Sequence, residues 1–240
     1  MKHTLLTFLL LCSLMASASA SASALYQAYL AGDMQQWGDY LAETDKQEYF
    51  SVEELASIAN YEYGYIAWCL GEKRTDEAKQ RLSQFEKRIS QLESMNYNPS
   101  MVAVFRSSVC AYSLSLYKRD LIKTMKEAID YTDKAVTLEP ENPLALTLQG
   151  NVRFYTPAMF GGSKKEALEL FLKAEKIMRN SNRIHCWNYR ALQLCIAQCY
   201  EKVESKKAAI NYCEQILSEV PEFAYIRDVY LPKLLGKTAK

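Results

Sequence analysis

The chain has 240 residues, of which 49% are hydrophobic and 24% are charged, so it can bury the core of about one domain and is neither disordered nor fibrous. Eight glycines and six prolines are few for this length, which argues against an all-β fold with many tight turns. The 29 Lys and Arg residues balance 28 Asp and Glu residues, which excludes nucleic-acid binding driven by bulk charge.

The amino terminus has the pattern of a secretory signal. Lys2 and His3 precede an apolar run over residues 5–11 that only Thr7 interrupts, and alternating Ala and Ser fill residues 16–24. The apolar run is too short to span a bilayer, and the small residues are typical of a cleavage zone. We therefore expect a signal peptide over residues 1–24.

Processing of this leader leaves two alternatives. Cleavage after Ala22 or Ala24 is favoured, since both end an A-x-A pattern. Cys12 suggests a lipoprotein instead, but Leu11 stands where the lipoprotein motif needs a small residue. Because no later run of about 18 apolar residues follows, we expect an exported protein, periplasmic or secreted, with no integral membrane segment in the mature chain.

Beyond the leader, apolar residues recur every three or four positions, which predicts an all-α protein. Asn98-Pro99, Asn142-Pro143 and Pro221 mark ends of helices, because proline stops a helix or begins one. Helices joined by such short turns are expected to pack as antiparallel pairs. The predicted helices cover residues 26–31, 34–44, 52–71, 75–94, 100–118, 122–138, 143–156, 164–179, 185–203, 206–218 and 222–235.

The second half of the chain contains an internal repeat. Counting back from Pro221 by 5, 8, 12, 21 and 24 residues gives Ile216, Cys213, Ala209, Tyr200 and Ala197. The same steps back from Pro140 include Ala135, Thr132 and Ala128, and the next unit carries Gly150, Ala167 and Phe171. Residues 100–221 therefore resemble the tetratricopeptide (TPR) repeat family. The resemblance implies a right-handed α-solenoid with a concave groove that binds a protein or peptide.

The chain is expected to divide into four parts. After the leader, residues 25–98 are degenerate helical repeats, residues 99–221 are TPR-like repeats, and residues 222–240 form a capping helix and tail. Residues 25–98 carry a net charge of −6 and residues 99–240 a net charge of +6. Opposite charges of this kind can steer a protein partner or a second copy of the chain.

Partner-binding residues are expected on the first helix of each repeat and in one inserted loop. Tyr61, Tyr65 and Trp68 form an aromatic stripe at helical spacing, for which a place in the core is the alternative. The groove-facing steps of the two clear repeats include Asn151, Phe154, Tyr155 and Gln198. The loop over residues 156–163 carries Phe160, which either binds a partner or fills a gap between helices.

Catalysis is not expected. His185 is the one histidine beyond the leader, so neither a histidine pair nor an H-E-x-x-H motif can form, and we read it as a surface or capping residue. No cofactor is expected. Six cysteines are best read as free buried thiols, with one disulfide or a three-thiol metal site as alternatives. They are Cys69, Cys110, Cys186, Cys195, Cys199 and Cys213.

Together these features predict a non-catalytic interaction scaffold of the bacterial cell envelope. The expected partner is a protein or peptide held in the concave groove, and the chain can also pair with a second copy of itself. The alternative is a binder of a small ligand such as a glycan, because tyrosine rings in a groove hold sugars by stacking on their faces.

Overall fold

The structure is a computed structural model that describes residues 22–237, so the predicted signal peptide falls almost entirely outside the described residues. Within them the protein is all-α, as predicted, with no strand and no helix long and apolar enough to cross a membrane. A helix over residues 22–31 comes first. It is followed by α2 (Gln35–Thr44), α3 (Val52–Gly71), α4 (Thr75–Ser94), α5 (Pro99–Leu116), α6 (Leu121–Leu138), α7 (Pro143–Tyr155), η1 (Ala158–Phe160), α8 (Lys164–Asn180), α9 (Trp187–Val203), α10 (Lys206–Glu219), η2 (Tyr225–Tyr230) and α11 (Leu231–Leu234).

Local capping explains why these helices begin where the sequence predicts. Ser51 and Glu54 form a reciprocal capping box at the start of α3. Asn98 and Asn142 cap α5 and α7 through their side-chain oxygens, and in both helices proline occupies the first position. The helix starts are therefore fixed by short-range chemistry.

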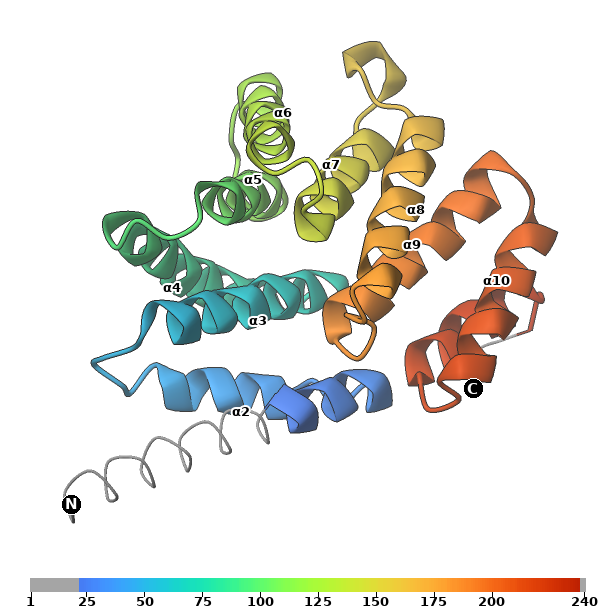
Figure 1. Cartoon of the computed structure of the whole chain (residues 1–240), viewed down its shortest axis with the longest axis horizontal. Coiled ribbons are helices and arrows are strands. Elements are labelled where there is room, and N and C mark those ends of the chain that lie inside the picture. The colour runs from blue at the N-terminus through green and yellow to red at the C-terminus, as the bar shows by residue number, and fades with distance from the viewer. Residues whose placement is uncertain (1–21, 238–240) are drawn as a thin grey trace.

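Successive helices pack as antiparallel hairpins in chain order, α3 with α4, α5 with α6, α7 with α8 and α9 with α10 (Figure 1). The small residues of the predicted repeat register lie where these helices approach most closely. Ala128, Ala167, Ala197 and Ala209 are buried, and a Cβ on Gly150 would lie 2.4 Å from the ring of Phe171. Larger side chains at these positions would push the paired backbones apart.

The two ends of the chain meet, which the sequence analysis did not predict. Trp187, at the start of α9, packs edge-on against Trp37 of α2 with ring centroids 5.3 Å apart. Arg190 Nε donates to the hydroxyl of Tyr26 at 3.0 Å, and the ring of Tyr29 lies 5.7 Å from that of Phe223. The first helix therefore packs against the last hairpin (Figure 1), and the hairpins close on themselves instead of ending in two free faces.

A buried charge cluster joins α2, α3 and α4. The Glu62 side chain is fully buried, and its Oε1 lies 3.3 Å from Arg81 Nη1 and 3.5 Å from Arg88 Nη1. Both arginines also pair with Asp45 at the end of α2, at 2.9 and 2.8 Å. This network fixes the end of α2 on α3 and α4.

The C-terminal segment differs from the single helix predicted over residues 222–235. The structure has a π-helical turn over Tyr225–Tyr230, followed by one short α-helical turn. Pro232 is the physical reason, since it cannot donate to the carbonyl four residues earlier and its ring would clash with that carbonyl. Phe223 and Tyr230 are buried, so the segment still covers the last hairpin.

All six cysteines among the described residues are free thiols. Burial raises the pKa of Cys69, Cys199 and Cys213 to about 12, which makes these thiols poor nucleophiles in the folded protein.

We expect alkylation of the folded protein to be slow at these three cysteines, and alkylation of the denatured protein to modify all six without prior reduction. Intact-mass measurement after each treatment checks this. Denatured protein that takes up label only after reduction would contradict it.

Candidate functional site

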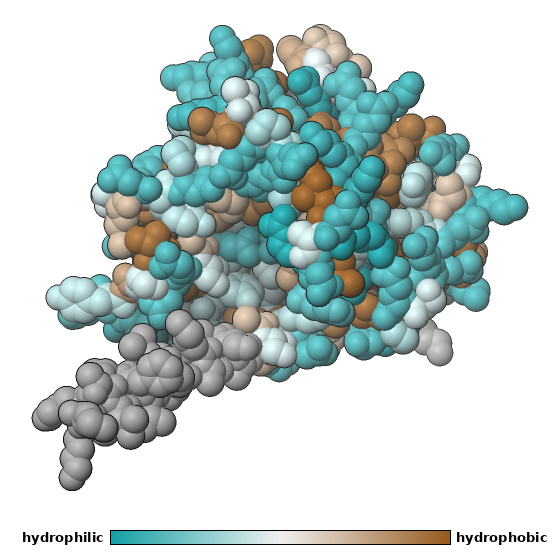
Figure 2. Space-filling view, viewed as in Figure 1, coloured by the Kyte–Doolittle hydropathy of each residue, from teal (hydrophilic) through white to brown (hydrophobic). Residues whose placement is uncertain are grey.

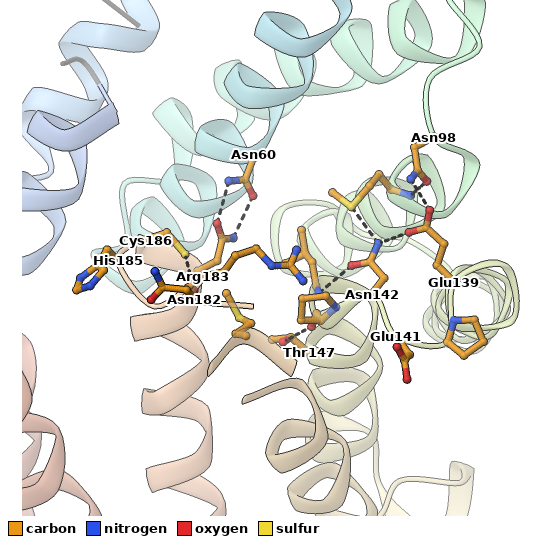
Figure 3. A pocket seen from close by; sticks show the side chains of 16 residues that line it. Asn60, Asn98, Glu139, Glu141, Asn142, Thr147, Asn182, Arg183, His185 and Cys186 are labelled. Carbon is orange, nitrogen blue, oxygen red and sulfur yellow. Dashed lines mark hydrogen bonds between the residues drawn. The ribbon is translucent and has the colours of Figure 1, made fainter. Parts of the chain in front are cut away.

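A pocket of about 920 Å³ opens where the amino-terminal ends of three first helices converge (Figure 3). The first turns of α5 and α7 form one wall, the turn from α8 to α9 forms the opposite wall, and α3 contributes from the side. Its polar lining residues are Asn60, Asn98, Glu139, Glu141, Asn142, Thr147, Asn182, Arg183, His185 and Asn188.

Amide side chains organise this pocket. Asn98 and Asn142 each donate to the carboxylate of Glu139, at 2.5 and 2.7 Å, so the caps of two adjacent helices share one acceptor. Asn60 of α3 and Asn188 of α9 exchange two hydrogen bonds of 3.0 Å, which closes the pocket on its third side. The amide groups are held in place by one another, so they form a fixed polar rim.

The turn from α8 to α9 supplies the charged and sulfur-containing side chains. Arg183 and His185 are exposed on this wall, and half-buried Cys186 precedes α9 (Figure 3). No group of three His, Cys, Asp or Glu side chains in residues 22–237 is arranged to hold a metal ion. A ligand in this pocket would meet amides, the carboxylates of Glu139 and Glu141, the imidazole of His185 and one guanidinium.

Four tyrosines from the first helix, α3, α7 and η2 lie near Cys195 of α9 or near one another. Burial, together with nearby Cys195, raises the pKa of Tyr29 and of Tyr63. Tyr155 is 70% exposed and lies near Cys195, Cys199 and Tyr225. Phenol groups from four elements, the first helix, α3, α7 and η2, therefore lie beside α9. We define the tyrosine cluster as Tyr29, Tyr63, Asn151, Tyr155, Cys195 and Tyr225.

The rings of Trp187 and Tyr112 pack against Tyr63 of this cluster. The ring of Tyr63 lies 5.9 Å from that of Trp187 and 6.1 Å from that of Tyr112. The hydroxyl of Tyr112 donates to the backbone carbonyl of Tyr63 at 2.8 Å, and Cys195 Sγ donates to Asn151 Oδ1 at 3.5 Å. These contacts fix the ring of Tyr63.

The pocket and the tyrosine cluster belong to one continuous surface. On α3, Asn60 in the pocket is three residues before Tyr63 in the cluster. On α7, Thr147 is four residues before Asn151. Residues at these spacings share a helix face about 5 to 6 Å apart along the axis. The polar rim therefore leads directly to the phenol groups.

The predicted aromatic stripe on α3 is part of the core. Tyr61 packs edge-on against Trp37, and Tyr65 is buried with its hydroxyl donating to Glu77 at 2.5 Å. Trp68 is half-buried, with the guanidinium of Arg74 4.9 Å from its ring centroid. The stripe faces the first helix (residues 22–31) and α2. The structure therefore favours a place in the core for these residues, which was the alternative to the groove.

The predicted residues of the clear repeats are only partly brought together. Asn151 and Tyr155 lie in the tyrosine cluster. Phe154 is half-buried between Tyr155, 4.9 Å away, and the ammonium of Lys164, 5.6 Å from its ring centroid. Gln198 is half-buried on α9.

The inserted loop holds its apolar side chains outside the core. Met159 is 82% exposed and lies in solvent, whereas Phe160 is 41% exposed and partly covered by the rest of the protein. Gly161 has a φ of +87°, and a Cβ on Gly162 would lie 1.8 Å from the carbonyl oxygen of Thr156. Both glycines are therefore needed for the turn that presents these side chains.

Replacing Phe160 with Ala should change the free energy of unfolding by less than about 1 kcal/mol, because the ring is only partly covered and lies in a surface turn. Truncating a buried phenylalanine costs about 3 to 5 kcal/mol, as we expect for Phe171→Ala in the core between α7 and α8. Urea denaturation of the two variants checks the difference. Equal losses of unfolding free energy in the two variants would show that Phe160 belongs to the core.

Sequence reasoning missed most residues of this surface. Tyr63 and Asn60 lie on the same helix as the predicted stripe but on a different face, and Tyr29 and Tyr225 lie outside the clear repeats. One signal for the pocket is present in the sequence. The dipeptide Asn-Pro begins both α5 and α7, and each asparagine lines the pocket.

Comparison with known proteins supports the class of fold, an all-helical protein of packed hairpins. No family model matches the sequence, and no curated protein matches it. Among solved structures, the chain is similar to the HusA haemophore from Porphyromonas gingivalis, with a TM-score of 0.58 and 19% sequence identity over 77% of this chain and 95% of the haemophore. This likeness shows the fold, and the tetratricopeptide resemblance stays a prediction.

Proposed function

We propose that this chain is a non-catalytic binding protein that holds a small, flat, amphipathic molecule between the tyrosine cluster and the amide-lined pocket. The observation that carries the proposal is that Tyr29 and Tyr63 both pack on Trp187 at the start of α9, at 6.0 and 5.9 Å between ring centroids, and that Asn151 of α7 lies 3.5 Å from Cys195 of α9. Tyr155 and Tyr225 lie beside these residues and are exposed. Phenol rings offer flat apolar faces and polar edges, so they suit a ligand with the same two properties.

The closed arrangement of the hairpins favours a small ligand over the peptide expected from the repeat resemblance. Trp187 and the Asn60–Asn188 pair join α9 to α2 and α3, so the inner surface is bounded at both ends. A pocket of about 920 Å³ lies in the range of small-molecule sites. An extended peptide needs an open groove.

A haem-type tetrapyrrole is the first ligand to test, because the structural neighbour HusA is a haemophore. Tyr155 carries an oxygen and Cys195 a sulfur of the types that ligate haem iron, and Arg183 at the pocket rim is a cation suited to the carboxylates of such a ligand. The glycan remains the second candidate, favoured by the amide rim. We also propose that the protein acts after export, as its leader predicts.

Titration with haem, followed by absorbance in the Soret region, should give saturable binding. Tyr155→Ala and Tyr225→Ala should each weaken binding at least about tenfold, which corresponds to about 1.4 kcal/mol. Both side chains are exposed, so the melting temperature should stay within about 2 °C. Tyr155→Phe should change the spectrum if the hydroxyl is the iron ligand.

Tyr49→Ala is the matched control, because Tyr49 is 89% exposed in the loop before α3, away from the tyrosine cluster. This variant should bind haem as the wild type does. Iron-free protoporphyrin should compete if the rings recognise the macrocycle. Haem binding that is absent, or that tolerates both tyrosine substitutions, would contradict the tetrapyrrole, and a sugar that raises the melting temperature would favour the glycan.

A further inference from the structure

Two turns on one edge of the protein expose large apolar side chains. Residues 117–123, which form the α5–α6 turn and the start of α6, carry Leu121 and Ile122, and residues 157–165, which form the α7–α8 turn and the start of α8, carry Met159 and Phe160. Five of the thirteen exposed large hydrophobic side chains in the described residues lie in these two short turns. Figure 1 places both turns along the upper edge of the view, and Figure 2 shows apolar side chains at that edge.

The α7–α8 turn is built to keep its apolar residues in solvent. The amide of Phe160 donates to the carbonyl of Pro157 at 2.9 Å, and the amide of Gly161 donates to that of Ala158 at 3.0 Å. Arg153 Nη1 then donates to the carbonyl of Gly161 at 2.9 Å, which ties the turn to α7. A turn held this firmly does not fold its tip back onto the core, so Met159 stays exposed.

Basic residues surround both apolar tips. Residues 117–123 and 157–165 together contain five Lys or Arg residues and one acidic residue, Asp120, and the next acidic residues are Glu127 and Glu166. Asp120 caps α6 by accepting a hydrogen bond from the amide of Lys123 at 3.0 Å. Its negative charge therefore interacts with the amino terminus of α6. Lys123, Lys164 and Lys165 are exposed and have no ion-pair partner within 4 Å in residues 22–237.

The edge is separate from the amide-lined pocket, whereas Tyr155 of the tyrosine cluster, the last residue of α7, directly precedes the α7–α8 turn. The amino-terminal ends of α5 and α7 line the pocket, whereas the two turns follow the carboxyl-terminal ends of the same helices. At 1.5 Å per residue, the 18 residues of α5 span about 27 Å. A surface that covers the turns therefore leaves the pocket open.

We propose that this edge docks on an anionic lipid surface. Apolar tips of this size enter the boundary between headgroups and acyl chains, while the surrounding lysines face the phosphates. The surplus of positive charge favours a negatively charged bilayer over the neutral apolar face of a protein. Binding at this edge would hold the protein beside a membrane without a spanning helix.

The test is flotation of the purified protein with vesicles of phosphatidylcholine, either alone or mixed with phosphatidylglycerol. The wild type should bind the mixed vesicles and lose binding at high salt. Met159→Ser with Phe160→Ser, and separately Leu121→Ser with Ile122→Ser, should each lower the partition coefficient at least about tenfold. Lys164→Gln with Lys165→Gln should lower it about 25-fold, at about fivefold per lysine.

Tyr49→Ser is the control, since it removes an even more exposed aromatic side chain from another part of the surface and should leave vesicle binding unchanged. Circular dichroism confirms that each variant is folded. No binding to mixed vesicles, equal binding to neutral vesicles, or binding that survives all three double substitutions would overturn the proposal. Self-association that these substitutions abolish would assign the edge to a protein contact instead.

Discussion

Replacing Arg88 with Met should lower the free energy of unfolding by about 3 to 5 kcal/mol at pH 8, because it leaves the buried carboxylate of Glu62 with one arginine instead of two. Burial raises the pKa of Glu62 to about 7, although both arginines oppose this. At pH 5 the folded protein therefore carries a neutral Glu62, and the loss should be smaller. Urea denaturation at the two pH values measures both losses.

The matched control is Arg88→Met combined with Glu62→Gln. The second substitution removes the carboxylate that the first one leaves short of a partner, so the double variant should recover more than half of the stability lost at pH 8. A loss that is the same at both pH values, or that Glu62→Gln does not reduce, would show that Arg88 acts through packing against Phe50 and not through its charge.

Replacing Trp187 with Ala should lower the free energy of unfolding by about 3 to 5 kcal/mol, the cost of truncating a large buried ring. Trp187 lies between Trp37, Tyr29 and Tyr63, so it joins the last hairpin to the first helices. Its loss should also loosen residues 22–44. Hydrogen exchange in that segment, followed together with thermal unfolding, measures the coupling.

Trp68→Ala is the comparison for this variant. Trp68 is half-buried and contacts Arg74 and Tyr65 on the same hairpin, so its removal should cost less and leave exchange in residues 22–44 unchanged. If the two tryptophan variants behaved alike, the ends of the chain would not be coupled through Trp187.

Most helix bounds could be predicted because they depend on short-range signals. The predicted helices over residues 52–71 and 75–94 match α3 and α4 to the residue, and capping asparagines with proline set the starts of α5 and α7. The C-terminal segment escaped prediction because a periodic pattern does not reveal that Pro232 forces a wider turn.

The faces of α3 could not be predicted, because this helix is apolar nearly all round. It packs against α2 on one side and against α4 and α5 on the others. Hydrophobic spacing then fits several faces of α3 equally well, so it predicts Tyr61 and Tyr65 for the groove as readily as Tyr63. Only the position of the first helices decides between them, and that position depends on contacts with residues beyond 187.

The contact between the two ends also sets the order of folding. Tyr26 and Arg190 are separated by 164 positions, so this hydrogen bond has a very high contact order. An open stack of hairpins can nucleate anywhere and fray from its ends, whereas here the first helix finds its partner only after the last hairpin has been synthesised. The nascent chain therefore stays incomplete until its final segment is available, and the finished protein should unfold as one cooperative unit.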